Sequence, residues 1–337
     1  MAATTSEPRL RLMAFGPAWG MPSMDAASTK AAAWMKFCGL REGADFEIDP
    51  CSKVHVGLTG ELPMLQSIDA EGNPLLAEPH EVCSALAALG HDADAKLSAA
   101  QRAESLAFSA LIEERLHVAL LYAWWEDEVN YDAVIRPTLG ATLSMPLTIY
   151  LPWMLRRRVH SQLARRRCLG TDTAYAMGEA ALEALAVRLG SRPFFHGDAP
   201  TGVDASAFGY LSAALRCPLP NDRLRVAMRS HPNLVAFCER IAGAHFGGSE
   251  PLLPATTPAP PRLRNMNGRQ IAEQQTAGSS NAPGVGDAVS TKEVRTPKQE
   301  RFRRRSRNAV LGALGTAVAY ALAVGTFDKE AEESDED

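Results

Sequence analysis

The sequence predicts an α/β domain at the N-terminus, an all-helical domain after it, and a single membrane-spanning helix near the C-terminus. Short apolar runs alternate with helical patterns over the first 92 residues, which is the rhythm of a mixed α/β layer. Apolar helical stripes continue to about residue 247, and residues 308–327 carry no charged side chain. With 337 residues, of which 46% are hydrophobic, the chain is long enough for two compact units and extra segments.

The composition excludes several classes of function. A net charge of −4 argues against a dedicated nucleic-acid-binding protein, because phosphate binding requires a clustered basic excess. The eight histidines show no HxxxH or HExxH spacing, and the chain has no GxxxxGK loop. Metal-dependent hydrolysis and nucleotide use therefore lack support, and we expect neither a metal nor a cofactor.

The cysteines indicate a reducing environment. None belongs to a CxxC pair, and the N-terminal stretch MAATTSEPRL lacks the apolar core of a secretion signal. We interpret them as reduced thiols on the cytosolic side of a membrane or in the cytosol, and most simply as small buried apolar side chains. They are Cys38, Cys51, Cys83, Cys168, Cys217 and Cys238.

Residues 9–92 are expected to form the α/β domain. The stretch DAEGNP at 69–74 is a turn signal that joins two strands in a hairpin, and Pro63 starts the first of them. The resulting order is that of a thioredoxin-like domain, in which this proline is usually cis, so Leu62–Pro63 is our candidate for a cis bond, with trans as the alternative. The elements are a strand at 10–15, a helix at 23–38 closed by Gly39, strands at 46–48, 64–68 and 75–76, and a helix at 78–89 closed by Gly90.

Residues 96–247 are expected to form the all-helical domain. One apolar stripe at helical spacing covers residues 103–111, and the aromatic residues Tyr122, Trp124 and Trp125 are best interpreted as core packing. Each expected helix begins at a polar side chain that can cap it. These starts are Ser98 with Gln101, Asp172 for a helix that ends at Gly190, and Thr201 with Asp204 in a capping box where Asp replaces Glu.

Residues 308–327 are the candidate membrane span. Twenty residues without a charge would make a helix about 30 Å long, which is the thickness of a bilayer hydrocarbon core. Alanine and glycine make the stretch only modestly hydrophobic, so the alternative is a helix packed against the protein. Gly312, Gly315, Thr316 and Ala319 would also let a second transmembrane helix approach closely, although chance explains this spacing about as well in so alanine-rich a segment.

The charges on either side of this stretch favour the membrane. A basic flank at 301–307 precedes the span and an acidic tail at 328–337 follows it, and basic residues stay on the cytosolic side. A span this close to the end of the chain predicts post-translational insertion, as in a tail-anchored protein. The mitochondrial outer membrane suits a short, weakly hydrophobic anchor, with peroxisomal and endoplasmic-reticulum membranes as alternatives. The basic residues are Arg301, Arg303, Arg304, Arg305 and Arg307.

Residues 248–300 are expected to be a disordered linker rich in Pro, Gly and Ser. They contain seven of the 22 prolines and no aromatic residue, so they cannot build a core. As a flexible coil the 53 residues would span about 40 Å, which would let the folded body move over the membrane while it stays tethered.

Several motifs in register resemble the glutathione-transferase superfamily. The stretch FFHGDAPTGVDASAFGYL at 194–211 is similar to its F-x-G-D-x-P-T-x-x-D hallmark. Within that superfamily the chain resembles the metaxins, in FGPAWGMPSMD at 15–25, WEDEVNY at 125–131, the MP and LP pairs at 145–146 and 151–152, and HPNLVAFCERI at 231–241. The helical half is also similar to the failed-axon-connections proteins, and the expected anchor favours the metaxins.

The resemblance implies a non-enzymatic subunit of the sorting and assembly machinery. It would face the cytosol from the mitochondrial outer membrane and act in protein import and in the insertion of β-barrel proteins. The partners implied are the outer-membrane β-barrel insertase and a second metaxin-like subunit, with precursor proteins as further ligands. A third interpretation is a structural tether that recruits partners through residues 248–300.

The main alternative is a membrane-bound glutathione-dependent enzyme of the failed-axon-connections type. Transferases of the superfamily activate glutathione with a Tyr, Ser or Cys just after the first strand. The loop here, GPAWGMPS, offers Ser23 as its one hydroxyl, or a backbone N–H near Trp19–Gly20, to assist the thiolate. Ser23 stands where a helix N-cap is expected, so we interpret it as a cap. Glu78 is followed by Pro79 where the superfamily usually has an acidic residue followed by Ser. Half of the glutathione-binding feature is therefore missing.

Two arginine triplets in LPWMLRRRVHSQLARRRC are a candidate surface for a lipid or a partner protein. Corresponding residues of the two triplets are nine positions apart, which is two and a half turns of a helix, so together they cover most of its circumference. The simplest interpretation is a solvated basic helix, and the sharper one is a patch that meets anionic lipid head groups or an acidic partner. The residues are Arg156, Arg157, Arg158, Arg165, Arg166 and Arg167.

Overall fold

The computed structural model describes residues 10–50, 62–68, 74–141 and 147–247. The chain divides into two units, Met1–Leu263 and Arg264–Asp337, and every described residue lies in the first. The segments expected at 248–300, 301–307, 308–327 and 328–337 lie outside the described residues. So do Cys51 and the turn at 69–73.

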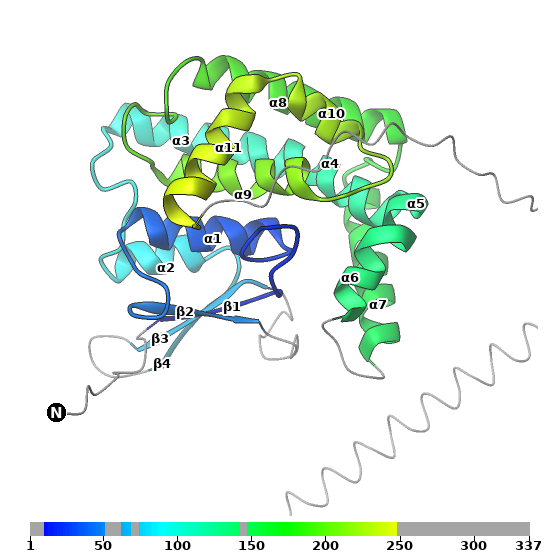
Figure 1. The fold of residues 1–337 in the computed structure, drawn as a ribbon, viewed down its shortest axis with the longest axis horizontal. Helices are drawn as coiled ribbons and strands as arrows, with labels where there is room; N and C mark the ends of the chain where they lie inside the picture. Colours follow the sequence, from blue (N-terminus) through cyan, green and yellow to red (C-terminus); the bar gives the residue numbers. More distant parts are fainter. Residues whose placement is uncertain (1–9, 51–61, 69–73, 142–146, 248–337) are drawn as a thin grey trace, which may run out of the picture. The chain divides into compact units, whose positions relative to one another are not determined.

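The N-terminal domain has one four-stranded sheet in the order β2-β1-β3-β4. The strands are β1 (Leu10–Ala14), β2 (Phe46–Pro50), β3 (Met64–Ile68) and β4 (Pro74–Ala77). Strand β1 runs parallel to β2 and antiparallel to β3, and β3 runs antiparallel to β4. Helices α1 (Ala26–Phe37) and α2 (Val82–Ala88) cover the same face of the sheet (Figure 1). The predicted thioredoxin-like order is confirmed, and the Leu62–Pro63 peptide bond is cis.

The start of α1 differs from the prediction. Ser23 was expected to cap the helix, but the N-cap is Asp25, whose carboxylate accepts hydrogen bonds from the backbone N–H and the hydroxyl of Ser28 at 2.8 and 2.9 Å. Ser23 lies two residues earlier, and its hydroxyl oxygen accepts the N–H of Asp25 at 3.1 Å. The prediction was wrong because both residue types cap helices well, and the carboxylate reaches the first turn directly.

The helical domain opens with one long helical run from Ala99 to Glu126. Its first residues follow the predicted capping box, in which Ser98 accepts the N–H of Gln101 and Gln101 accepts the N–H of Ser98. π-helical turns alternate with α-helix along this run and the next, and they are not evident from the sequence pattern. The elements are α3 (Ala99–Leu111), η1 (Ile112–Leu116), α4 (His117–Leu121), η2 (Tyr122–Glu126), α5 (Glu128–Asn130), η3 (Tyr131–Ile135) and α6 (Arg136–Ala141).

Helices α1, α3, α4, α10 and α11 pack around α9, whose fifteen residues are all buried. Small residues occupy much of this helix, so α1 of the sheet domain can pack closely against it (Figure 1). One predicted start is wrong, because α8 begins at Thr171 after Gly170, while Asp172 lies in the first turn and pairs with Arg223. The elements are α7 (Leu147–Arg165), α8 (Thr171–Leu189), α9 (Gly202–Arg216), α10 (Arg223–Arg229) and α11 (Pro232–His245).

The capping box at the start of α9 is present and buried. The carboxylate of Asp204 accepts the backbone N–H and the hydroxyl of Thr201 at 2.9 and 2.6 Å, and also the N–H of Phe195 at 2.9 Å. Asp204 is fully buried, so these three bonds offset part of the cost of removing its charge from water. They fix the loop before α9 at the centre of the helical domain.

Candidate functional site

The loop between β1 and α1 stands where the superfamily places its thiol-activating residue. Backbone bonds between Ala18 and Met21 close a tight turn, at 3.3 and 2.9 Å. Trp19 takes a left-handed conformation in this turn, with φ of 54°, at a cost on the order of 1 kcal/mol for a residue with a Cβ. Its ring packs edge-on against Trp124 of the helical domain, with 5.6 Å between the ring centres. The turn therefore docks the loop onto the helical domain.

Ser23 cannot serve as the activating hydroxyl in this arrangement. The residue is 1% exposed. Its hydroxyl oxygen accepts the N–H of Asp25, and its carbonyl oxygen accepts the hydroxyl of Thr29 at 3.3 Å. Both polar groups thus hold the entry to α1 rather than face a ligand.

A small apolar cavity lies between this loop and the helical domain. Phe15, Met24, Trp124 and Leu155 are among its lining residues, and its volume is about 60 Å³. Pockets that bind small molecules usually offer about 300 Å³ or more. The one imidazole in the lining is His117, whose pKa is lowered by burial to about 4, so it is neutral at physiological pH. The cavity has room for a few water molecules but not for a tripeptide.

A second, more open groove of about 360 Å³ lies where α1, α2, α3 and α9 meet. Its charged groups are engaged in the structure itself. Lys30 pairs with Glu113 at 2.6 Å, and Asp94 accepts the N–H of Gly202 at 2.7 Å. The thiol in its lining, Cys83, has a pKa raised by burial, which disfavours the nucleophilic thiolate. The groove therefore offers polar surface and no activated nucleophile.

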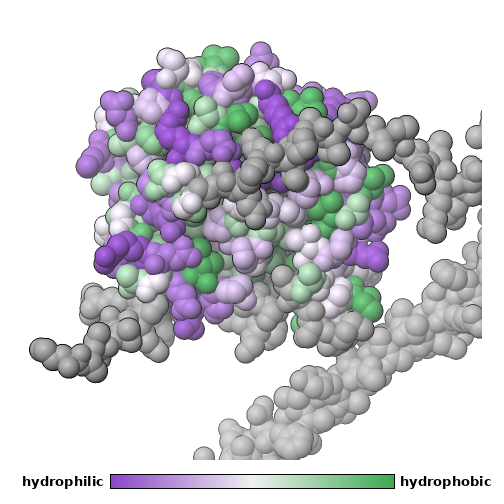
Figure 2. All heavy atoms as spheres, in the orientation of Figure 1, coloured by the Kyte–Doolittle hydropathy of each residue, from purple (hydrophilic) through white to green (hydrophobic). Residues whose placement is uncertain are grey.

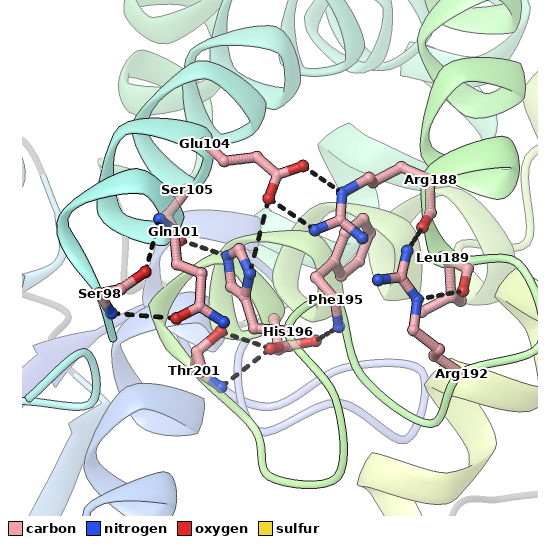
Figure 3. Close-up of polar contacts among 11 residues, drawn as sticks. Ser98, Gln101, Glu104, Ser105, Arg188, Leu189, Arg192, Phe195, His196 and Thr201 are labelled. Carbon is pink, nitrogen blue, oxygen red and sulfur yellow. Dashed lines mark hydrogen bonds and ion pairs between the residues drawn. The ribbon is translucent and has the colours of Figure 1, made fainter. Parts of the chain in front are cut away.

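A partly buried polar network joins α3, α8 and the loop before α9 (Figure 3). The hydroxyl of Ser105 lies 2.7 Å from Nε2 of His196, and Nδ1 of His196 lies 3.8 Å from Glu104. Glu104 also receives two bonds from Arg188, at 2.6 and 2.7 Å. Burial lowers the pKa of His196. The order hydroxyl, imidazole, carboxylate is that of a hydrolase triad, but the carboxylate is held by Arg188 and Ser105 is 5% exposed. We interpret the network as a structural contact that holds α3, α8 and the loop before α9 together.

The structure separates the six arginines predicted as one patch. The guanidinium of Arg156 stacks on the ring of Tyr131, 4.3 Å from its centre. Arg166 forms a two-bond pair with Glu114 at 2.6 and 3.3 Å. Arg156 thus ties α7 to η3, and Arg166, directly after α7, ties the end of that helix to η1. The others are exposed: Arg157, Arg158, Arg165 and Arg167.

Three exposed apolar residues on the same helix are not evident from the sequence. Ile149, Tyr150 and Trp153 are 68%, 56% and 54% exposed. The guanidinium of Arg157 lies over the Trp153 ring, 5.7 Å from its centre. The stretch IYLPWMLRRR places these apolar residues before the arginines. The same pattern is equally consistent with apolar residues that are buried in the core. In the space-filling view polar residues dominate, with apolar residues scattered among them (Figure 2).

The described residues contain neither a membrane-spanning helix nor a metal-binding cluster. Within residues 10–247, gaps excepted, no helix combines the length and the hydrophobicity that a membrane crossing needs. In the same part of the chain no three His, Cys, Asp or Glu side chains gather in a way that could hold a metal ion. The five cysteines described there are free thiols.

The chain matches two protein families along its body. Residues 28–156 match the family described as "Outer mitochondrial membrane transport complex protein". Residues 178–241 match "Glutathione S-transferase, C-terminal domain", in agreement with a sheet domain followed by a helical domain. Among solved structures, a glutathione transferase family member from Pseudomonas fluorescens matches with a TM-score of 0.46 and 12% identity, over 72% of this chain and 91% of that one.

Two curated relatives match most of the chain. Metaxin-1 of Macaca fascicularis is 32% identical, over 75% of this chain and 80% of its own length. The metaxin-1 homolog of Caenorhabditis briggsae is 30% identical, over 94% of this chain and 96% of its own length. Sequence identity at this level, over most of both aligned chains, shows common descent and a common fold. The chain therefore belongs to the metaxin family.

Proposed function

We propose that this chain is a non-enzymatic, tail-anchored protein of the mitochondrial outer membrane that works in protein import with its body in the cytosol. The observation that carries the proposal is the match to the Caenorhabditis briggsae metaxin-1 homolog over 94% of this chain. A match of that extent continues past residue 247 into the C-terminal segment. There the sequence holds the uncharged stretch 308–327 after a basic flank. The match of residues 28–156 to an outer-membrane transport family supports the same membrane.

The proposal includes β-barrel insertion. In this role the body binds the outer-membrane β-barrel insertase and a second metaxin-like subunit, and it contacts precursor proteins as they pass. The chemistry of the described residues supports recognition over catalysis. Ser23 is buried and bonded, and burial raises the pKa of the thiols of Cys38, Cys83 and Cys238. A protein with such a site acts through its surface.

An import assay tests this role. Mitochondria depleted of the chain are supplied with the full-length protein, and the assembly of a radiolabelled β-barrel precursor is compared with that of a matrix-targeted precursor. We expect the β-barrel precursor to lose assembly on depletion and to regain it on resupply, while the matrix precursor is much less affected. Equal assembly with and without the chain would contradict the proposal. Replacing residues 248–300 by a Gly/Ser linker of equal length should preserve rescue, whereas the tether interpretation requires its loss.

One observation favours a second candidate, a glutathione-dependent enzyme. The carboxylate oxygen Oε1 of Glu78 is buried and has no hydrogen-bond partner among the described residues. The resemblance places the acidic residue that holds the glutathione backbone at this position. A buried carboxylate oxygen without a partner is costly, and a ligand N–H would satisfy it. The unpaired oxygen is therefore the reason to test the chain for glutathione binding.

A conjugation assay separates the two candidates. The full-length protein in mild detergent is tested for glutathione-dependent conjugation and for a glutathione-induced rise in its unfolding temperature. We expect neither to saturate with glutathione. Saturable activity that is lost in Glu78→Gln and kept in Glu81→Gln, an exposed carboxylate nearby, would support the enzyme and contradict our first proposal.

A further inference from the structure

The outward side of helix α7 carries an unusual set of side chains. We call Ile149, Tyr150, Trp153 and Arg157 the α7 face. Their positions, at i, i+1, i+4 and i+8, lie on one side of an α-helix. The three apolar members are more than half exposed. An aromatic pair lies within this set, since the rings of Tyr150 and Trp153 are 6.1 Å apart.

The opposite side of α7 already serves the core. Leu151, Val159 and Leu163 are buried there, and Arg156 and Arg166 tie the helix to neighbouring segments. A helix needs one apolar side to pack into its own domain. The α7 face therefore does not contribute to the packing of its own domain. A group of exposed apolar side chains of this kind marks a surface that binds another molecule or a membrane.

The chemistry of the α7 face fits the surface of a membrane. Tyrosine and tryptophan rings prefer the level of the lipid head groups, where one end is apolar and the other is hydrated. Arg157 stacks on Trp153 and leaves its guanidinium available to a phosphate. Arg158 and Arg165 are exposed farther along the same helix. This basic extension favours anionic lipid.

Two carboxylates of the helical segments beside α7 have partners within the protein. Glu126 of η2 lies 3.0 Å from the imidazole of His160 on α7. Asp132 of η3 pairs with Arg136 at 3.1 Å. The negative charge of Asp132 is therefore offset within the protein, that of Glu126 is offset only when His160 is protonated, and the exposed charges of the last turns of α7 are basic.

We propose that the α7 face rests on the anionic lipid surface of the membrane that anchors the chain. This inference rests on the proposed tail anchor. The 53 residues from 248 to 300 would hold the body within about 40 Å of the span. Such a tether raises the local concentration of the membrane so far that a weak contact is populated. A second copy of the chain or another protein are the occupants that the test must exclude.

The test uses Trp153 as its own reporter. The full-length protein is inserted into vesicles of phosphatidylcholine alone, or of phosphatidylcholine with an equal amount of phosphatidylserine, each with brominated acyl chains that quench tryptophan. The stretch 308–327 contains no tryptophan, and Trp34, Trp124 and Trp125 are at most 8% exposed. Trp19 is partly exposed, so the signal that remains in Trp153→Phe measures its share. We expect quenching in the anionic vesicles that is lost in Trp153→Phe and strongly reduced in phosphatidylcholine alone.

Two paired variants control for general effects of polarity. Ile149→Ser with Tyr150→Ser keeps the reporter and should reduce its quenching. Leu106→Ser with Val187→Ser removes two residues that are 73% and 78% exposed on other helices, and it should leave quenching unchanged. Arg157→Gln with Arg158→Gln should abolish the difference between the two lipid mixtures.

The outcomes separate this inference from the proposed anchor, because alkaline extraction of the same vesicles reports the anchor alone. Protein that resists extraction while Trp153 is not quenched overturns the inference and leaves the anchor in place. Protein that is extracted by alkali but is quenched through Trp153 before extraction overturns the anchor and supports the α7 contact. Loss of a co-purifying protein in the Ile149→Ser, Tyr150→Ser variant, with quenching unchanged, assigns the face to that protein and also overturns the inference.

Discussion

Gly209 of α9 lies directly against the carbonyl oxygen of Ala26 in α1. A Cβ atom on Gly209 would be 2.5 Å from that oxygen and 2.9 Å from the backbone N of Lys30. Both neighbours are backbone atoms, so the helix itself would have to move to make room. This contact joins the sheet domain to the central helix of the helical domain. The close approach of the two backbones explains why α9 carries small residues where α1 crosses it.

Replacing this glycine should destabilise the junction between the domains. We expect Gly209→Ala to lower the free energy of unfolding by about 1 to 3 kcal/mol, because α1 must shift from a packed position. Gly243 in α11 is the matched control, since nothing lies within 4 Å of its added Cβ, and Gly243→Ala should be neutral or stabilising by up to about 1 kcal/mol. Denaturant unfolding of the full-length protein in detergent measures both. Equal effects of the two substitutions would contradict the assigned packing.

The buried capping box at α9 should give stability a specific dependence on pH. Burial raises the pKa of Asp204 from 3.8 to about 6, although the hydroxyl of Thr201 and the N–H groups of Phe195 and Thr201 act in the opposite direction. Because its pKa is higher in the folded state, this carboxyl contributes stability below about pH 4 that is lost as the pH rises through about 6. A shift of this size corresponds to about 3 kcal/mol.

Comparison with Asp204→Asn isolates that contribution. The variant cannot titrate at this position and loses part of the cap, so it should be less stable than the wild type at every pH. The difference in unfolding free energy between the two proteins should be largest near pH 4 and should shrink toward pH 7. If the difference in unfolding free energy stays constant or grows between pH 4 and pH 7, the pKa of Asp204 is not raised in the folded state.

The pair of Glu104 and Arg188 should couple α3 to α8. Their two bonds are short, and the Arg188 side chain is only 15% exposed. A double-mutant cycle with Glu104→Gln and Arg188→Gln should give a coupling energy of about 1 kcal/mol or more. The exposed pair of Arg41 and Asp45 is the control, and its coupling energy should be clearly smaller because solvent screens it. A coupling energy between Glu104 and Arg188 no larger than that of the control pair would show that this pair does not stabilise the fold.

Local signals predicted most of the architecture. The turn at 69–74 and the alternation of apolar runs were enough for the sheet order, and the capping boxes at Ser98 and Thr201 are as predicted. The start of α1 was missed because Ser23 and Asp25 are equally good caps by type. Only the path of the chain after β1 decides which of them reaches the first turn.

The candidate surface could be predicted only in part. The arginines of α7 are visible in the sequence, but their partners are distant along the chain, as with Arg166 and Glu114. The exposure of Trp153 depends in the same way on how α7 packs. The π-helical turns are a third example, since the local sequence at Tyr122–Glu126 gives no signal for them. Tertiary contacts, which a local pattern does not contain, set all three.

The most direct test of this account uses isolated mitochondria from cells that express the full-length chain with an N-terminal tag. Membranes are extracted with alkaline carbonate, and intact organelles are treated with protease. A tail-anchored outer-membrane protein with a cytosolic body predicts that the tag stays in the membrane pellet and is removed by external protease. Release of the tag into the supernatant, or protection from protease until the outer membrane is opened, would contradict the account.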